Sequence, residues 1–334
     1  MTVEVIRAGL FTTVQDQGRF GLQHIGVPAS GAMDAYALQI ANCLVGNDAS
    51  AAALEITITG PVLKFSEDTL VALSGAEFEP VVDGKAVPMN RPVWIASGRR
   101  LSFGRCVAGC RVYLAFAGGV DVAPVLGSRS TYVRAALGGI AGRALKAGDR
   151  IATVANGINH CERVRDSARF QQDGFAAPRW SVQAGFERLQ LRPQCIRFVA
   201  GRHWSVLPAG MQEQFTSATF RVGSSSDRMG YRLEGVGLES GEGGDIASEA
   251  VAFGTIQLPP DGNPIVLMAD RQTIGGYPRL GEVASADLPL LAQLKPGDAL
   301  RFERIALADA QRLAYMQAAA LKQMSASVAA NLKA

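Results

Sequence analysis

The chain has 334 residues, of which 48% are hydrophobic and 19% are charged, and its formal net charge at pH 7 is +3. This composition indicates a globular protein long enough for two domains. Because the charge is nearly balanced, aromatic residues make up only 7%, and no run of lysines or arginines stands out, the sequence argues against a nucleic-acid partner. No apolar run approaches the ~18 residues of a membrane span and no secretory signal opens the chain, so we expect a cytoplasmic protein.

The cysteines support the same location. They are Cys43, Cys106, Cys110, Cys161 and Cys195. A sparse, odd-numbered set in a long chain is typical of a reducing compartment. Cys106 and Cys110 are close in sequence, but no second pair and no neighbouring histidine completes a zinc site, so the sequence predicts no metal.

Short strands separated by glycine and proline dominate the first half of the chain. Period-two and apolar patterns predict strands within 3–14 and at 54–58, 70–73, 92–96, 101–103 and 112–117, with a helix over 33–45. Asp83-Gly84 predicts a tight hairpin turn, because both residues tolerate positive φ. This spacing predicts a mainly β protein with closed or sandwiched sheets.

The second half continues the pattern. It predicts strands at 197–200, 220–222 and 265–269, short helices at 208–215 and 285–294, and a helix over 308–324 followed by a tail that should fray. Leu145-Lys146-Ala147-Gly148-Asp149 recurs as Leu294-Lys295-Pro296-Gly297-Asp298, each time about thirty residues after an apolar strand that runs into a Gly-Gly loop. We infer two related β lobes, at 1–155 and 191–306, with a linker at 156–190 and a helix and tail at 307–334.

The candidate functional stretch follows the apolar run 265–269. Asp270, Arg271, Gln272 and Thr273 place an anion, a cation, an amide and a hydroxyl before a Gly-Gly turn, a composition suited to a pocket. A second Asp-Arg pair, Asp227-Arg228, lies upstream. We hypothesise that the two pairs converge on one pocket with Gln272, Thr273 and the loop around Ser30. The alternative is that each pair is structural, for example an arginine that fixes a loop carbonyl.

Five segments resemble one protein family. They are residues 12–19 (TTVQDQGR), 26–34 (GVPASGAMD), 127–132 (GSRSTY), 226–233 (SDRMGYRL) and 269–278 (ADRQTIGGYP). Together they resemble the KipA family, also known as the allophanate hydrolase subunit 2 family, the family of the 5-oxoprolinase C subunit, or the urea amidolyase-related biotin-dependent carboxyltransferase family. The resemblance runs from about residue 3 to 305 and implies cyclophilin-like β-barrel lobes.

The resemblance also implies partners and chemistry. The partner would be a KipI-like protein, with a LamB/YcsF-like protein as a further member of the complex. The activity would be ATP-dependent cleavage of 5-oxoproline to glutamate, or carboxyl transfer in a urea carboxylase-like system with biotin supplied in trans, or regulation through a KipI-binding module. The sequence contains no P-loop, so an ATP site would be of another kind or lie in the partner.

Each of these substrates presents a carbonyl oxygen beside an N–H, so a site needs a donor or cation and an acceptor. Asp-Arg pairs supply both. We therefore expect Asp270, Arg271, Asp227 and Arg228 to be catalytic. The expected substrate-binding residues are Gln272, Thr273, Gly275, Gly276, Tyr277, Ser30, Asp34 and Arg129.

Overall fold

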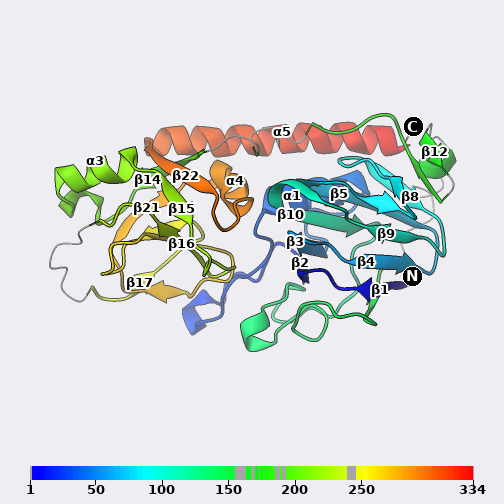
Figure 1. Ribbon diagram of the computed structural model, residues 1–334, viewed down its shortest axis with the longest axis horizontal. Helices are drawn as coiled ribbons and strands as arrows, with labels where there is room; N and C mark the ends of the chain where they lie inside the picture. Colours follow the sequence, from blue (N-terminus) through cyan, green and yellow to red (C-terminus); the bar gives the residue numbers. More distant parts are fainter. Residues whose placement is uncertain are drawn as a thin grey trace. The chain divides into compact units, whose positions relative to one another are not determined.

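The structure, a computed structural model, describes residues 2–154, 163–166, 170–172, 174–183, 185, 189, 193–238 and 246–333. The chain divides into two compact units (Figure 1). Unit 1 comprises Met1–Arg19, Asp34–Glu187 and Ala320–Ala334, and unit 2 comprises Phe20–Met33 and Arg188–Ala319. Part of the expected linker at 156–190 lies outside the described residues, and the expected lobe boundaries stay a prediction.

Unit 1 contains two sheets. Their strand orders are β11-β1-β4-β9-β6-β7 and β12-β13-β8-β5-β10-β3-β2. The strands are β1 (Thr2–Arg7), β2 (Phe11–Gln15), β3 (Ala53–Thr57), β4 (Val62–Phe65), β5 (Thr69–Phe78), β6 (Val81–Val82), β7 (Lys85–Ala86), β8 (Pro92–Ile95), β9 (Arg100–Ser102), β10 (Cys106–Phe116), β11 (Arg150–Ala152), β12 (Phe170–Gln172) and β13 (Phe175–Ala177). Buried Val3 and Val5 alternate with exposed Glu4 and Ile6, and buried side chains from both sheets share one core.

Local sequence accounts for the connections of unit 1. Helix α1 (Ala35–Leu44) begins at Asp34, whose carboxylate accepts the Ala37 N–H at 2.9 Å. The β6–β7 turn has positive φ at Asp83 and Gly84, which confirms the predicted hairpin. Short 3-10 helices lie at η1 (Gln23–Ile25), which belongs to unit 2, and η2 (Val133–Ala135).

Unit 2 contains a closed seven-stranded barrel in the order β14-β21-β18-β19-β16-β15-β22. The strands are β14 (Gln194–Ala200), β15 (Phe220–Val222), β16 (Gly230–Glu234), β18 (Thr255–Gln257), β19 (Ile265–Leu267), β21 (Arg279–Val283) and β22 (Ala299–Arg304), beside a small sheet of β17 (Glu249–Ala250) and β20 (Ile274–Gly275). The β14–β22 pair is parallel and the other barrel pairs are antiparallel. With this barrel, the predicted mainly β class is confirmed.

Short helices pack against the barrel, and aromatic residues of both helices and strands form its core. They are η4 (Trp204–Val206), α3 (Ala209–Ser217), η5 (Ser285–Asp287) and α4 (Leu288–Ala292). Phe215 of α3 stacks on Phe302 of β22 with ring centroids 4.7 Å apart, and Phe198 and Trp204 pack edge-on against Phe215. Aromatic pairs at these distances add to the free energy gained by burial, so α3 is firmly seated on the barrel.

The two copies of the repeated pentapeptide form the same turn. In unit 1, Gly148 N–H donates to Val5 O at 2.8 Å and Val5 N–H donates to Asp149 O at 2.9 Å. In unit 2, Gly297 N–H donates to Val222 O at 2.8 Å and Val222 N–H donates to Asp298 O at 3.0 Å. The two glycines have φ of 86° and 87°. This equivalence supports the inferred duplication.

The C-terminal helix is longer than predicted. Helix α5 (Leu307–Lys333) continues through the tail that was expected to fray, so that expectation is wrong. Val328 and Leu332 are only 2% and 4% exposed, and burial of these apolar side chains stabilises the last turns. Within the described residues, no helix combines the length and hydropathy needed to cross a bilayer.

Candidate functional site

Asp270, Arg228 and Ser30 meet at one point of unit 2. Arg228 donates to Asp270 from Nε (2.9 Å) and Nη2 (3.0 Å), and the Ser30 hydroxyl donates to Asp270 Oδ1 at 2.6 Å. The backbones are also paired, because Asp270 N–H donates to Arg228 O at 2.7 Å. These three residues of the hypothesised site are therefore in contact with one another, and the pocket itself stays a prediction.

The hydrogen bonds of this cluster give it a structural role, in which Arg228 anchors a loop. Arg228 Nη2 also donates to Gly31 O at 2.6 Å, so the guanidinium holds a loop carbonyl as well as a carboxylate. Asp270 and Arg228 are 6% and 7% exposed. A bidentate pair with these further hydrogen bonds satisfies both charges internally. The cluster therefore fixes the loop at residues 28–31 to the end of β19.

Asp227 takes a different direction from Arg228. It is exposed, and its Oδ1 accepts the N–H groups of Met229 (2.7 Å) and Gly230 (3.3 Å). This is an Asx turn that starts β16. Asp227 thus contributes to a turn, and the ionic partner of Arg228 is Asp270.

Arg271 is a partly buried cation with much of its hydrogen-bonding capacity unused. Its Nη1 donates to Met268 O at 3.3 Å, and its guanidinium lies 5.9 Å from the ring centroid of Phe253. Among the described residues, its buried Nε has no hydrogen-bond partner. Burial lowers the pKa of Arg271, and the charge of Glu282 opposes that shift. Such a group is suited to donate to an added oxygen.

Charged residues that sequence analysis did not single out form a chain of ion pairs in unit 2. Glu282 accepts from Arg279 Nη2 at 2.5 Å and from the Thr255 hydroxyl at 2.7 Å. Arg279 also lies 3.7 Å from Glu249, which accepts from Arg202 at 3.2 Å. In the sequence these residues look like ordinary surface charges of short strands and turns. Only their ion pairs in the folded structure set them apart from other charged residues.

The other predicted residues of the 270–277 stretch belong to a strand and its turn. Thr273 O accepts Val251 N–H at 3.2 Å, and β20 pairs with β17. At Gly275 a Cβ would lie 2.5 Å from the Gln257 amide nitrogen, so a larger residue there would displace the end of the Gln257 side chain. Tyr277 is 44% exposed. Gln272 is half-buried and Gly276 follows β20.

Asp34 and Arg129 lie in unit 1. Asp34 caps α1 with its carboxylate, and its N–H donates to the hydroxyl of Tyr113 at 2.8 Å. Tyr113 donates in turn to Glu55 at 2.6 Å. Burial, the charge of Glu55 and that of Asp34 raise the pKa of Tyr113 well above its usual value. Asp34 is fully buried within this network.

The first and third quoted motifs meet through Asp16 in unit 1. Asp16 accepts from the hydroxyls of Ser128 (2.6 Å) and Ser130 (2.5 Å) and from the Arg129 N–H (2.6 Å). The Arg129 side chain donates to Val122 O at 3.0 Å. These bonds tie the segment after β2 to residues 128–130.

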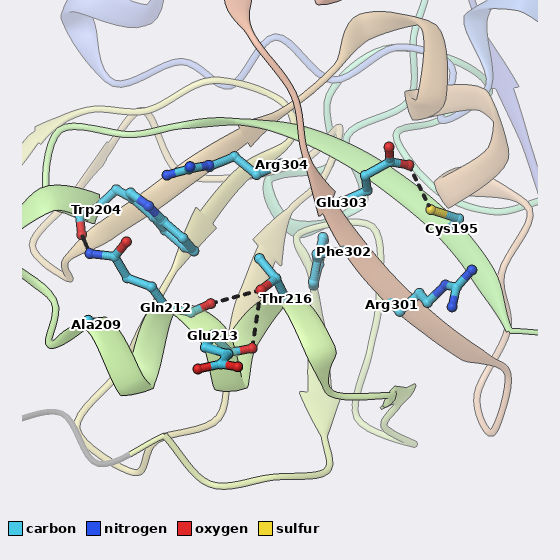
Figure 2. Close-up of a pocket in the computed structure, with 10 residues that line it drawn as sticks. All are labelled: Cys195, Trp204, Ala209, Gln212, Glu213, Thr216, Arg301, Phe302, Glu303 and Arg304. Atoms are coloured by element: carbon cyan, nitrogen blue, oxygen red, sulfur yellow. Dashed lines mark hydrogen bonds between the residues drawn. The ribbon is translucent and has the colours of Figure 1, made fainter.

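A separate cavity of about 580 Å³ lies against β14, α3 and β22 (Figure 2). It is lined by Cys195, Trp204, Ala209, Gln212, Glu213, Thr216, Arg301, Phe302, Glu303 and Arg304. None of these residues was predicted to form a site. Several polar groups of the lining are already engaged: Gln212 donates to Trp204 O, Thr216 donates to backbone carbonyls of α3, and Cys195 donates to Glu303.

Within the described part of the chain, no group of three or more His, Cys, Asp or Glu side chains is placed to bind a metal. Burial, followed by the bonding and charge of Glu303, raises the pKa of Cys195. Its thiol is therefore a poor nucleophile near neutral pH. Within the 270–277 stretch, the residue with the clearest chemical capacity is Arg271, a partly buried cation.

Comparison with known proteins places this geometry in context. Residues 25–304 match the family described as carboxyltransferase domain, subdomain A and B. The chain is 39% identical to the C subunit of the Escherichia coli 5-oxoprolinase over 92% of this chain and 93% of the relative, and 34% identical to that of Haemophilus influenzae over 93% and 94%. The crystal structure of the K. lactis urea amidolyase matches with a TM-score of 0.82 and 32% identity over 96% of this chain, but this covers only 20% of the urea amidolyase.

Proposed function

Because the chain belongs to the carboxyltransferase domain family, subdomains A and B, we propose that it is the C subunit of a 5-oxoprolinase. The observation that carries the proposal is its similarity, along nearly their whole lengths, to two proteins of that name. The enzyme would act with a KipI-like protein and a LamB/YcsF-like protein as its other subunits, and would couple ATP hydrolysis to opening of a cyclic amide.

In the proposed reaction, water is added across the ring C–N bond of 5-oxoproline. The hydroxyl goes to the carbonyl carbon, a proton goes to the nitrogen, and glutamate is released. Amide resonance makes the carbonyl a weak electrophile, so a donor at its oxygen must stabilise the charge that develops there. Arg271 supports this role because it is partly desolvated and its Nε has no hydrogen-bond partner among the described residues.

The second candidate function is carboxyl transfer with biotin carried by another protein. The family description and the structural likeness to urea amidolyase favour this alternative. Its substrates, urea and the ureido ring of biotin, also place a carbonyl beside N–H groups. The same donor at Arg271 would serve either reaction, so the two functions are separated by their co-substrates.

The test is a coupled assay on the assembled enzyme. The chain is co-expressed and purified with its KipI-like and LamB/YcsF-like partners, and ADP release is followed with and without 5-oxoproline. Stimulation by 5-oxoproline supports the proposal. Stimulation that requires biotin and bicarbonate instead supports carboxyl transfer, and a stable complex without turnover supports a regulatory KipI-binding module.

Matched variants then test the site. Arg271→Gln should reduce kcat by about 100-fold, the usual cost of losing one donor to a developing oxyanion. Arg271→Lys should restore part of that loss because the charge is kept. The exposed Arg232 of β16 provides the control, and Arg232→Gln should leave the rate unchanged. Full activity in a folded Arg271→Gln enzyme would remove Arg271 from the site.

A further inference from the structure

We propose that the cavity against β14, α3 and β22 is a binding site for a small carboxylate, whose oxygens accept from the indole N–H of Trp204 and the guanidinium of Arg304 (Figure 2). The cavity lies within unit 2 and contains none of the residues assigned to the proposed reaction. The inference therefore goes beyond the proposed function and does not rest on it. The volume of about 580 Å³ is typical of a small-molecule site.

The lining of the cavity includes a buried donor that lacks an acceptor. Trp204 is 5% exposed, and its Nε1 has no hydrogen-bond partner among the residues that the structure describes. An indole N–H can only donate, and a buried donor that stays unpaired lowers stability. The ring packs edge-on against Phe198 and Phe215, with centroids 5.2 and 5.7 Å away, so its orientation is fixed. An oxygen supplied by a ligand would satisfy this donor.

Arg304 places a cation beside the same donor. Its guanidinium carbon lies 5.9 Å from the centroid of the Trp204 ring, and Figure 2 shows the side chain extended toward the indole. Arg304 is exposed, and no carboxylate in the described ranges forms an ion pair with it. Trp204 Nε1 is closed to solvent in the structure. Rotation of the exposed Arg304 side chain would admit a ligand oxygen between the two donors.

The start of α3 adds a third feature that favours negative charge. Ala209, the first residue of this nine-residue helix, lines the cavity, and Pro208 before it provides no side-chain cap. The first N–H groups of a helix have no partner within the helix, and the helix dipole adds a partial positive charge at this end. The helix start, the unpaired indole donor and the Arg304 guanidinium therefore favour an anion in the same cavity.

The charges of the lining indicate which class of anion fits. Arg301 and Arg304 are its cations and Glu213 and Glu303 its anions, so the formal charge of the lining is zero. A phosphate dianion would bring two negative charges close to these glutamates, and like charges repel at short range. A carboxylate brings one charge and matches the planar fork of an arginine. We therefore assign the site to a carboxylate.

The alternative is that the Trp204 donor stays unpaired and that Arg304 only covers the ring. The two cases differ in the indole proton, whose NMR signal moves downfield when a carboxylate accepts from it. The chain has three tryptophans, so labelling with ¹⁵N-tryptophan should give three indole signals. The Trp204→Phe variant identifies the signal of Trp204 by its loss.

The experiment titrates the whole chain with benzoate, a rigid carboxylate, and with benzamide, which keeps the shape without the charge. Benzoate should move the Trp204 indole proton downfield until the site is saturated, whereas benzamide at the same concentrations should not. Arg304→Gln should weaken benzoate binding at least about tenfold, the value of a hydrogen bond to a charged group. Trp204→Phe, measured by calorimetry, should weaken it at least about threefold because one donor is lost.

The control is Arg232→Gln, because Arg232 is an exposed arginine of β16 that does not line the cavity. It should leave the affinity for benzoate unchanged. If Trp204→Phe does not fold, Arg304→Gln decides, since an exposed side chain can be replaced without loss of core packing. An unmoved Trp204 signal, equal shifts with benzoate and benzamide, or an unchanged affinity in Arg304→Gln would each overturn the inference.

Inorganic phosphate at the same ionic strength tests the class of anion. It should move the Trp204 signal less than benzoate does, and a larger effect would overturn the assignment to a carboxylate. These titrations need neither ATP nor a partner protein. Their outcome is therefore independent of the ADP-release assay, and either proposal can fail while the other stands.

Discussion

Removing the carboxylate of Asp270 should destabilise unit 2 strongly. In the Asp270→Ala variant, Arg228 would keep its buried position but lose both hydrogen bonds to the carboxylate, and the Ser30 hydroxyl would lose its acceptor. Breaking a buried, hydrogen-bonded ion pair on one side typically costs about 3–5 kcal/mol, because an uncompensated charge remains in the interior. Both partners are more than nine-tenths buried, so solvent screening should reduce this cost little.

Urea unfolding can measure this loss in unit 2. Trp204 is 5% exposed within unit 2, so its fluorescence follows that unit once the tryptophans of unit 1 are replaced in a Trp94→Phe, Trp180→Phe background. With an m value of about 2 kcal/mol/M, a loss of about 4 kcal/mol lowers the midpoint by about 2 M urea. The neighbouring Asp227→Ala, which removes only an exposed turn contact, should lower it by less than about 0.5 M.

A double-mutant cycle tests the cause. Adding Arg228→Met to Asp270→Ala removes the unpaired buried charge. The double variant should therefore lose about 2 kcal/mol less unfolding free energy than the two single variants lose together. Additive losses, or an Asp270→Ala midpoint within about 0.5 M urea of the parent, would refute the claim that the buried Arg228–Asp270 ion pair stabilises unit 2. A large loss of stability would also mean that inactivity of Asp270→Ala is no evidence for a catalytic role.

Three further outcomes are expected. Since burial, followed by the neighbouring carboxylates, raises the pKa of Tyr113, the folded protein keeps this proton while the unfolded chain ionises near pH 10. Stability should therefore fall above about pH 10, and Tyr113→Phe should remove that part of the fall in urea unfolding at pH 8 and 11. Glu303→Gln should lower the raised pKa of Cys195 and speed its alkylation by iodoacetamide at pH 8, measured by peptide mass; an unchanged rate would contradict the assigned cause. Gly148→Ala and Gly297→Ala should each cost about 1–2 kcal/mol, because both glycines have φ near +86° and open space around a new Cβ; clearly unequal losses would argue against equivalent turns.

Much of the fold was predictable from local pattern. The alternation at residues 54–58, the helix predicted over 33–45 and the Asp83-Gly84 turn depend on side-chain periodicity and backbone conformation, which a short segment determines by itself. The repeat of Lys-x-Gly-Asp also predicted a repeated turn, and the hydrogen bonds in the two units are equivalent. The length of α5 could not be predicted, because burial of Val328 and Leu332 stabilises its final turns.

The site was predictable only in part. The sequence singled out two Asp-Arg pairs, but adjacent side chains in an extended or turning chain point in different directions. Asp227 therefore caps a turn, Asp270 pairs with Arg228 across the barrel strands, and Arg271 lies over the ring of Phe253.

The sequence by itself determined the mainly β class, the repeated turn and the stretch that carries Arg271, since each depends on residues close together in the chain. Only the tertiary structure decided which charges are paired. Arg228 and Asp270 are 42 residues apart, and Ser30 and Asp270 are 240 apart. Charge pairing depends on distance in space and on the exclusion of water, and both are set by closure of the barrel.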